Sequence, residues 1–270
     1  MFVLDKFGSC VENGDCNMVL IDSKKYDACF SFANDCRCGK VYPLSIVQLY
    51  QQGDVFTKCA FDWRTVLFWH YSGFAFIVGE YDEEFLGMIY KMISEKNSNN
   101  RRFILFNCDK RIDNYFVHKE NVAVEKRCFF EYNENINAVV SSTDYQVKVI
   151  DAESIKKIKG RITPAFSWDN MDDFLMKGKG YCIAINGEIA AWAFSAAISD
   201  KEIDIGVETN EKYQGMGLAT VVSKAMLKYI LREKKIPVWA CHFQNIASAK
   251  LAEKLGFKKI KECSVIKISK

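Results

Sequence analysis

The chain has 270 residues, of which 49% are hydrophobic and 26% charged, and its formal net charge is +3. This length allows one large domain or two ordinary ones. The near balance of charges gives no electrostatic case for a nucleic-acid partner. The N-terminal stretch has no apolar run of signal-peptide length, and the most apolar segment, residues 66–79, is too short to cross a bilayer. We therefore expect a cytoplasmic protein with no membrane and no nucleic-acid partner.

Eleven cysteines are present, and five of them crowd the N-terminal end: Cys10, Cys16, Cys29, Cys36 and Cys38. None of these five forms a C-x-x-C pair, and no histidine lies near them, so the usual ligand spacing of a zinc site is missing. The better interpretation is reduced thiols that are buried as small hydrophobic side chains. The sequence thus predicts no metal site.

Hydrophobic periodicity divides the first half into a short helix, three strands, a long amphipathic helix, a strand, a short helix and a strand. Residues 1–45 show no clean period. The predicted elements are 45–52, 55–60, 66–69, 74–78, 82–96, 102–107, 111–120 and 127–132.

A polar, Asn-rich segment, residues 131–144, predicts a boundary between domains at 1–135 and 144–270. The predicted elements of the second half follow the same order as those of the first. Its strands at 181–185 and 189–197 are joined by Asn186-Gly187, a strong hairpin signal. The predicted strands are 145–150, 181–185, 189–197, 202–209, 238–241 and 257–268, and the predicted helices are 152–159, 168–176, 218–232 and 245–255.

The most informative stretch is the turn between the strand at 202–209 and the long helix after it. Gly215 and Gly217 allow a ligand to approach the backbone closely. The first N–H groups of a helix have no partner within it, and that end carries partial positive charge, so the turn suits a phosphate. A dinucleotide-binding fold uses the same physics, but its third glycine is replaced here by Thr220.

Two motifs around this turn resemble those of the GNAT superfamily of acyl-CoA-dependent N-acyltransferases. The first is Gln214-x-x-Gly217-x-Ala219, and the second is Asn245-x-x-Ser248 running into residues 251–257. The resemblance covers residues 145–270, and further agreement at 205–209, 217–220 and 239–241 is similar to the zwittermicin-resistance-type branch. It implies an α/β fold with a mixed (α+β) sheet.

The resemblance implies a site for acetyl-CoA. Gln214 would fix the turn, and exposed backbone at Val207 and Thr209, splayed from residues 238–241, would pair with pantetheine and stabilise an oxyanion. Asn245 and Ser248 would lie at the edge of this site, although Asn245 could be only a helix N-cap and Ser248 could simply pack. The pyrophosphate would bind to backbone N–H groups across Gly215, Met216, Gly217, Leu218, Ala219 and Thr220.

Direct transfer needs a base that takes a proton from the amine. Glu208 is the favoured residue, Asp204 could instead position the amine, and His242 is a further candidate. The alternatives are two solvent-facing carboxylates and a structural histidine. Many family members carry a tyrosine acid in the helix after the asparagine motif, and Ala252 stands at that position here, so the acid stays unassigned.

The order of elements suggests that the first half is a degenerate GNAT-like module. Four carboxylates in its corresponding loop, residues 79–87, would repel a pyrophosphate, so it is expected to wall the acceptor cleft or to support the second half. Its aromatic side chains, Phe74 and Phe76 among them, are expected to be core residues.

The predicted function is acetyl-CoA-dependent N-acetylation of a primary amine of a small molecule. The alternative is a non-catalytic acyl-CoA-binding module, which Ala252 favours. The acceptor, the acyl length and the oligomeric state are left open by the sequence.

Overall fold

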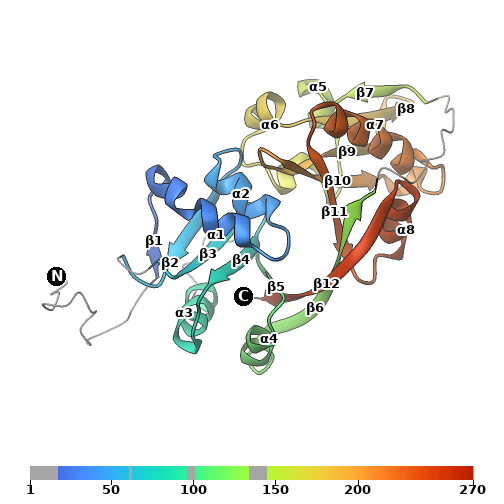
Figure 1. Cartoon of the computed structure of the whole chain (residues 1–270). Helices are drawn as coiled ribbons and strands as arrows, with labels where there is room; N and C mark the ends of the chain where they lie inside the picture. Colours follow the sequence, from blue (N-terminus) through green and yellow to red (C-terminus); the bar gives the residue numbers. More distant parts are fainter. Residues whose placement is uncertain (1–17, 61–62, 96–100, 134–144, 270) are drawn as a thin grey trace, which may run out of the picture.

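The computed structural model describes residues 18–60, 63–95, 101–133 and 145–269 (Figure 1). These residues form a mixed α/β fold around one sheet of 12 strands, in the order β1-β2-β3-β4-β5-β12-β6-β11-β10-β9-β8-β7. The predicted fold class is therefore confirmed. Among the described helices, none combines the length and apolar character that a bilayer-spanning segment requires.

The first half supplies six strands and four α-helices of the described chain. Its strands are β1 (Val19–Leu20), β2 (Gly53–Thr57), β3 (Thr65–His70), β4 (Phe74–Gly79), β5 (Phe103–Asn107) and β6 (Val122–Tyr132). Its helices are the 3-10 helix η1 (Ser23–Cys29), α1 (Phe30–Asp35), α2 (Val41–Val47), α3 (Glu83–Ser94) and α4 (Lys110–Phe116).

The second half supplies the other strands and helices. Its strands are β7 (Val147–Val149), β8 (Gly180–Ile185), β9 (Glu188–Ile198), β10 (Glu202–Thr209), β11 (Ile236–His242) and β12 (Phe257–Ile268). Its helices are α5 (Ala152–Lys157), η2 (Pro164–Phe166), α6 (Met171–Lys177), η3 (Glu211–Tyr213), α7 (Leu218–Arg232) and α8 (Ile246–Lys254).

Most predicted elements are confirmed within a few residues, and the β8–β9 turn has the positive φ angles expected of Asn186 (51°) and Gly187 (81°). The helix predicted at 45–52 is wrong, because α2 ends at Val47. All seven residues of α2 are buried, so it lacks the polar face that periodicity detects.

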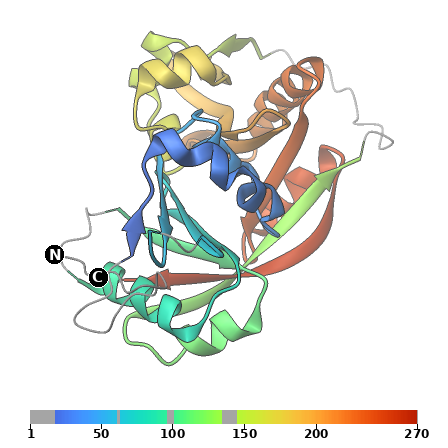
Figure 2. The same ribbon diagram turned by 60° about the vertical axis from the view of Figure 1, so that its left-hand side comes forward.

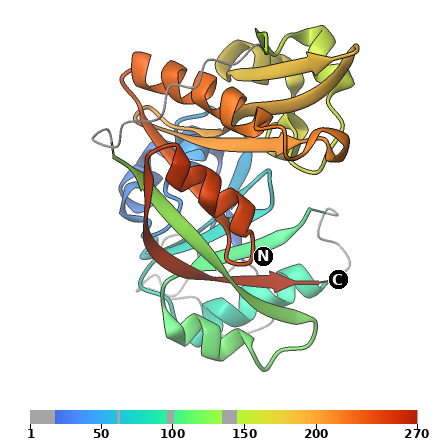
Figure 3. The ribbon, with the colours of Figure 1, turned by 90° about the vertical axis from the view of Figure 1, so that its right-hand side faces the viewer.

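The two halves exchange their last strands. β6 of the first half lies between β11 and β12, and β12 of the second half lies between β5 and β6. Figures 1 and 3 show these two long strands crossing from one half to the other. Each half also contains one parallel pair of strands, β4 with β5 in the first half and β10 with β11 in the second. The predicted boundary at 131–144 falls almost entirely outside the described residues, and the halves share one sheet across it.

Helices cover both faces of the second half's sheet. α7 packs on β8, β9 and β10, while α8 packs on β11 and β12 (Figure 3). α2 of the first half packs against β9 and β10 (Figure 2). Gln51, just after α2, is buried and donates to the carbonyls of Ser167 and Ala196 at 3.0 Å each. The first half is thereby held against the strands that carry the predicted site.

Candidate active site

The two central strands of the second half pair only at one end. β10 and β11 are parallel partners from Glu202–Asp204 opposite Ile236–Val238. Beyond Asp204, β10 continues along β9 as far as Thr209, and beyond Val238, β11 continues along β6 as far as His242. The facing backbone edges of residues 205–209 and 239–242 therefore lie outside the β10–β11 ladder, and Asp204 marks the point where the strands part.

The glycine turn after β10 leaves the start of α7 open. Gly215 and Gly217 have φ angles of 80° and 76°, and a Cβ added at either would meet nothing within 4 Å. Gly217 is the N-cap of α7, and no side chain caps this end. The Gln214 amide donates to the Thr209 carbonyl at 3.5 Å, which ties the turn to the end of β10. The turn thus presents uncapped helix N–H groups and no side-chain obstruction, which fits a phosphate-bearing ligand.

The corresponding helix of the first half differs at this end. Asp82 caps α3 by accepting from the Phe85 N–H at 2.8 Å. Lys58 bridges Asp82 and Glu84 at 2.7 and 2.6 Å. A carboxylate therefore already occupies the anion position at the start of α3, which supports the expectation that this half does not hold a pyrophosphate.

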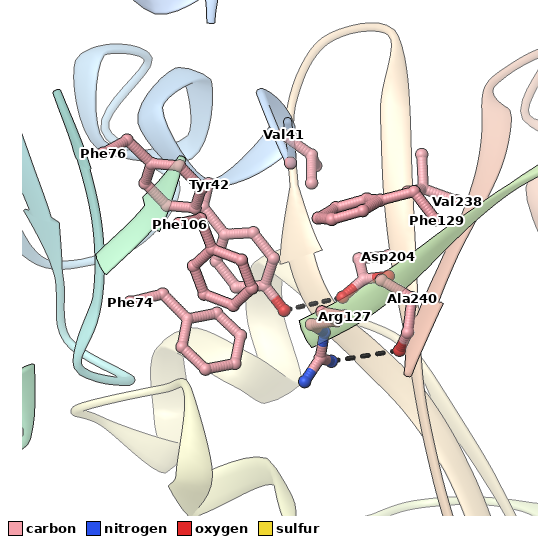
Figure 4. A pocket seen from close by; sticks show the side chains of 11 residues that line it. Val41, Tyr42, Phe74, Phe76, Phe106, Arg127, Phe129, Asp204, Val238 and Ala240 are labelled. Atoms are coloured by element: carbon pink, nitrogen blue, oxygen red, sulfur yellow. Dashed lines mark hydrogen bonds between the residues drawn. The ribbon is translucent and has the colours of Figure 1, made fainter. Parts of the chain in front are cut away.

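A pocket of about 10 Å³ lies where β10 and β11 part, between the two halves (Figure 4). That is close to the volume needed for one water molecule. Asp204 and Val238 line it from the second half, and the first half contributes aromatic side chains and one arginine: Tyr42, Phe74, Phe76, Phe106, Phe129 and Arg127. Phe74 and Phe76 are core residues as predicted, and they also face this pocket.

Asp204 is the acidic group of this pocket. It is 5% exposed, and its Oδ2 accepts a hydrogen bond from the Tyr42 hydroxyl at 2.6 Å. Oδ1 is buried and has no hydrogen-bond partner among the described residues. Burial raises the pKa of Asp204 to about 6, although the Tyr42 hydrogen bond and the charge of Arg127 oppose this rise. Asp204 is therefore a buried carboxylate with a pKa of about 6, and Oδ1 is the oxygen that Tyr42 does not bind.

Arg127 brings a positive charge to the pocket from β6. Its guanidinium carbon lies 5.3 Å from the ring centre of Phe74 and 5.7 Å from that of Phe106. It also donates to the Ala240 carbonyl on β11 at 3.0 Å (Figure 4). Because β6 is an exchanged strand, the first half supplies a cation to the pocket where β10 and β11 part.

Glu208, on the same strand as Asp204, is engaged elsewhere. Its carboxylate accepts from the backbone N–H groups of Arg161 at 3.2 Å and Ile162 at 2.6 Å. A Cβ added at Gly160 would lie 2.5 Å from Glu208 Oε2, so the loop approaches this carboxylate closely. Glu208 thus anchors the loop that follows α5.

His242, the third predicted catalytic residue, has both ring nitrogens occupied. Nδ1 accepts from the Gln244 N–H at 3.2 Å, which leaves the ring proton on Nε2. Nε2 lies 2.9 Å from the Glu125 carboxylate and donates to it. The ring is therefore tied to β6 and the backbone after β11, and we assign it no chemical role.

The residues of the second motif hold α8 in place. Asn245 is its N-cap and accepts from the Ser248 N–H at 3.0 Å. The Ser248 hydroxyl accepts from the Trp239 indole N–H at 3.2 Å. Ala252 is fully buried in the core. Any contact of Asn245 or Ser248 with a ligand stays a prediction.

Tyr42 and Arg127 were not among the candidates from the sequence. Each lies far from Asp204 along the chain, and neither stands in a motif. Only the packing of α2 on β10 and the exchange of β6 bring them to the same carboxylate.

A model of the family described as GNAT acetyltransferase matches residues 42–266. This match spans both halves and most of the chain, and the chain belongs to that family. A curated relative, the uncharacterised N-acetyltransferase YdfB of Bacillus subtilis (strain 168), is 24% identical over 201 residues, which are 72% of this chain and 77% of the relative.

Solved structures share the fold of both halves together. A GCN5-related N-acetyltransferase-like protein from Streptococcus suis 89/1591 has a TM-score of 0.72 at 18% identity, covering 92% of this chain and 99% of its own. A tandem GNAT protein from the clavulanic acid biosynthesis pathway has a TM-score of 0.61 at 10% identity, covering 94% and 99%. At these identities the likeness is one of fold.

Proposed function

We propose that this protein is an N-acetyltransferase that moves the acetyl group of acetyl-CoA directly to a primary amine of a small molecule. One observation carries the proposal: β10 and β11 part beside an uncapped glycine turn, and a buried carboxylate with a free oxygen lies where they part. An acetyl donor and a proton acceptor can therefore meet at one place.

The donor side uses backbone groups of the second half. N–H groups from Gly215 to Thr220 bind the pyrophosphate, with Gln214 holding the turn. Unpaired backbone of β10 at Val207 and Thr209 pairs with the pantetheine arm, and one N–H there stabilises the oxyanion. Acetyl-CoA supplies the acetyl group as a thioester.

The acceptor side uses Asp204, which we now prefer to Glu208 as the base. The ammonium first loses one proton to solvent. The neutral amine nitrogen then bonds to the thioester carbonyl carbon, the carbon–sulfur bond breaks, and the second amine proton passes to Asp204 Oδ1, directly or through one water that the pocket can hold. Tyr42 orients the carboxylate through its hydrogen bond to Oδ2. The CoA thiolate needs no dedicated acid to leave, because its pKa is only about 8.5.

The aromatic side chains and the Asp204 carboxylate that line the pocket favour an acceptor that carries a cationic amine. Resemblance to the zwittermicin-resistance-type branch would fit an antibiotic-like or amino-acid-like amine. The first half walls this pocket with its aromatic residues, which is the role proposed for it.

Release of free thiol from acetyl-CoA across a panel of small primary amines tests the proposal. We expect release with at least one cationic amine, and none with the matching tertiary amines, which cannot be acetylated. Tight binding of acetyl-CoA without release on any amine would instead establish the non-catalytic binding module.

Glu208→Gln tests which of the two carboxylates of β10, Glu208 or Asp204, acts as the base. If Glu208 only anchors the loop after α5, one of its two backbone hydrogen bonds is lost. We expect a loss of about 1–2 kcal/mol in unfolding free energy, and less than a tenfold fall in kcat/KM. A fall in kcat/KM of about 100-fold or more with unchanged stability would instead identify Glu208 as the base. Chemical denaturation and steady-state kinetics supply both readouts.

A further inference from the structure

Three cysteines that are far apart in the sequence meet at the junction of the two halves. Cys38 lies between α1 and α2, Cys108 follows β5, and Cys263 lies on β12. Their sulfur atoms all lie within 4.8 Å of one another, and those of Cys108 and Cys263 are 2.9 Å apart. Cys38 and Cys263 are buried, whereas Cys108 is exposed and gives access from solvent.

A fourth thiol lies beside this cluster. Cys36 is two residues before Cys38, is buried, and donates from its Sγ to the Cys38 carbonyl at 3.2 Å. The cysteines on these three segments thus place three sulfurs in one group, with the sulfur of Cys36 nearby. No sequence motif indicates this set, because Cys263 reaches the first half only through the exchanged strand β12.

Cysteine binds metal as the thiolate, and positive charge lies next to this cluster. The side chains of Lys261 and Arg37 place positive charge near Cys108. The Lys261 ammonium also contacts the Arg37 carbonyl, which keeps this cation next to the loop that carries Cys36 and Cys38.

We propose that Cys38, Cys108 and Cys263 bind a thiophilic metal ion of the Zn²⁺ type, with Cys36 as the fourth ligand. Zinc–sulfur bonds of about 2.3 Å place the sulfurs of a tetrahedral site about 3.8 Å apart. The three sulfurs lie within 4.8 Å of one another and one pair is 2.9 Å apart, so binding requires Cys108 and Cys263 to move apart and Cys36 to change rotamer. The alternative is that these thiols serve only as buried packing groups. It does not explain why Cys108, a member of the group, is exposed.

Such an ion would fix the walls of the Asp204 pocket. Gly39 and Tyr42, which follow Cys38, line that pocket, and so does Phe106, two residues before Cys108. One ion would thus tie α2, β5 and β12 together where the halves join. It would act as a structural metal, outside the transfer reaction.

The test uses the full chain, fully reduced and stripped of metal, and needs neither acetyl-CoA nor an acceptor. Titration with Zn²⁺ against a chromophoric chelator should give one ion per chain, and Co²⁺ should give thiolate-to-cobalt charge-transfer absorption. Saturating Zn²⁺ should raise Tm by about 5–10 °C. Both signals should weaken on acidification, because the thiols must lose their protons to bind.

Cys108→Ser is the main variant, because this exposed residue can be changed with little effect on packing. It should lower Zn²⁺ affinity at least about tenfold and reduce the charge-transfer absorption. Cys59→Ser, at a half-buried cysteine outside the cluster, should bind as the parent does. The proposal is overturned if reduced protein gives no charge-transfer absorption, if Cys108→Ser binds Zn²⁺ like the parent, or if a Cys108–Cys263 disulfide forms in air and the reduced thiols bind no metal.

Discussion

Gly217→Glu will abolish measurable acetyl-CoA binding in calorimetry, a loss of at least about 100-fold in affinity. The added side chain places a carboxylate at the uncapped start of α7, where the pyrophosphate is proposed to bind. It also forces an L residue to φ 76°, at a cost of about 1–2 kcal/mol. Gly217→Ala carries only this strain, so its affinity should fall far less.

Gly187→Glu is the matched control for this substitution. Gly187 also has a positive φ, 81°, and open space at its Cβ, but it lies in the β8–β9 turn. The two glutamate variants should lose similar stability, and only the one at Gly217 should lose acetyl-CoA. Equal affinity in both would remove the glycine turn from the donor site.

Asp204→Asn will lower kcat/KM by about 100-fold or more while leaving acetyl-CoA affinity unchanged, because asparagine keeps the shape but cannot accept the amine proton. In the parent enzyme, kcat/KM should fall as the pH drops below about 6, where Asp204 becomes protonated. A variant with activity within a few fold of the parent would exclude Asp204 as the base.

Tyr42→Phe is a second test of Asp204 as the base. The Tyr42 hydroxyl stabilises the ionised form of Asp204, so its loss should raise the pKa of Asp204 and move the acidic limb of the rate profile to higher pH. A change in Tm with an unmoved pH profile would show that Tyr42 is only a packing residue.

The stability of Asp204→Asn should change in the direction opposite to its activity. The pKa of Asp204 is raised in the fold from 3.8 to about 6, so the folded state holds this proton more tightly than the unfolded chain. Stability from this group is present below about pH 4 and is lost as the pH rises through 6. At neutral pH the variant should therefore be more stable than the parent, by on the order of 3 kcal/mol at most, and this advantage should vanish near pH 4. Urea denaturation at both pH values measures it.

The sequence by itself predicted the proposed donor half of the site. The turn at residues 213–220 and the asparagine motif are local: their glycines, capping groups and flanking strands are neighbours in the chain, so motif and periodicity predict them. β10 and β12 have the predicted bounds for the same reason. The family follows from these local features, and the match over residues 42–266 bears it out.

Only the tertiary structure shows the residues of the proposed acceptor half. α2 is buried on all sides and carries no amphipathic signal, yet it delivers Tyr42 to Asp204. The exchange of β6 and β12 brings Arg127 to the same pocket and Cys263 to Cys38 and Cys108. Strand pairing across more than 100 residues of chain leaves no local pattern, because the partners are selected by the whole sheet. For the same reason Glu208 and Asp204 look alike in the sequence, and only their neighbours in space distinguish the loop anchor from the buried carboxylate with a free oxygen.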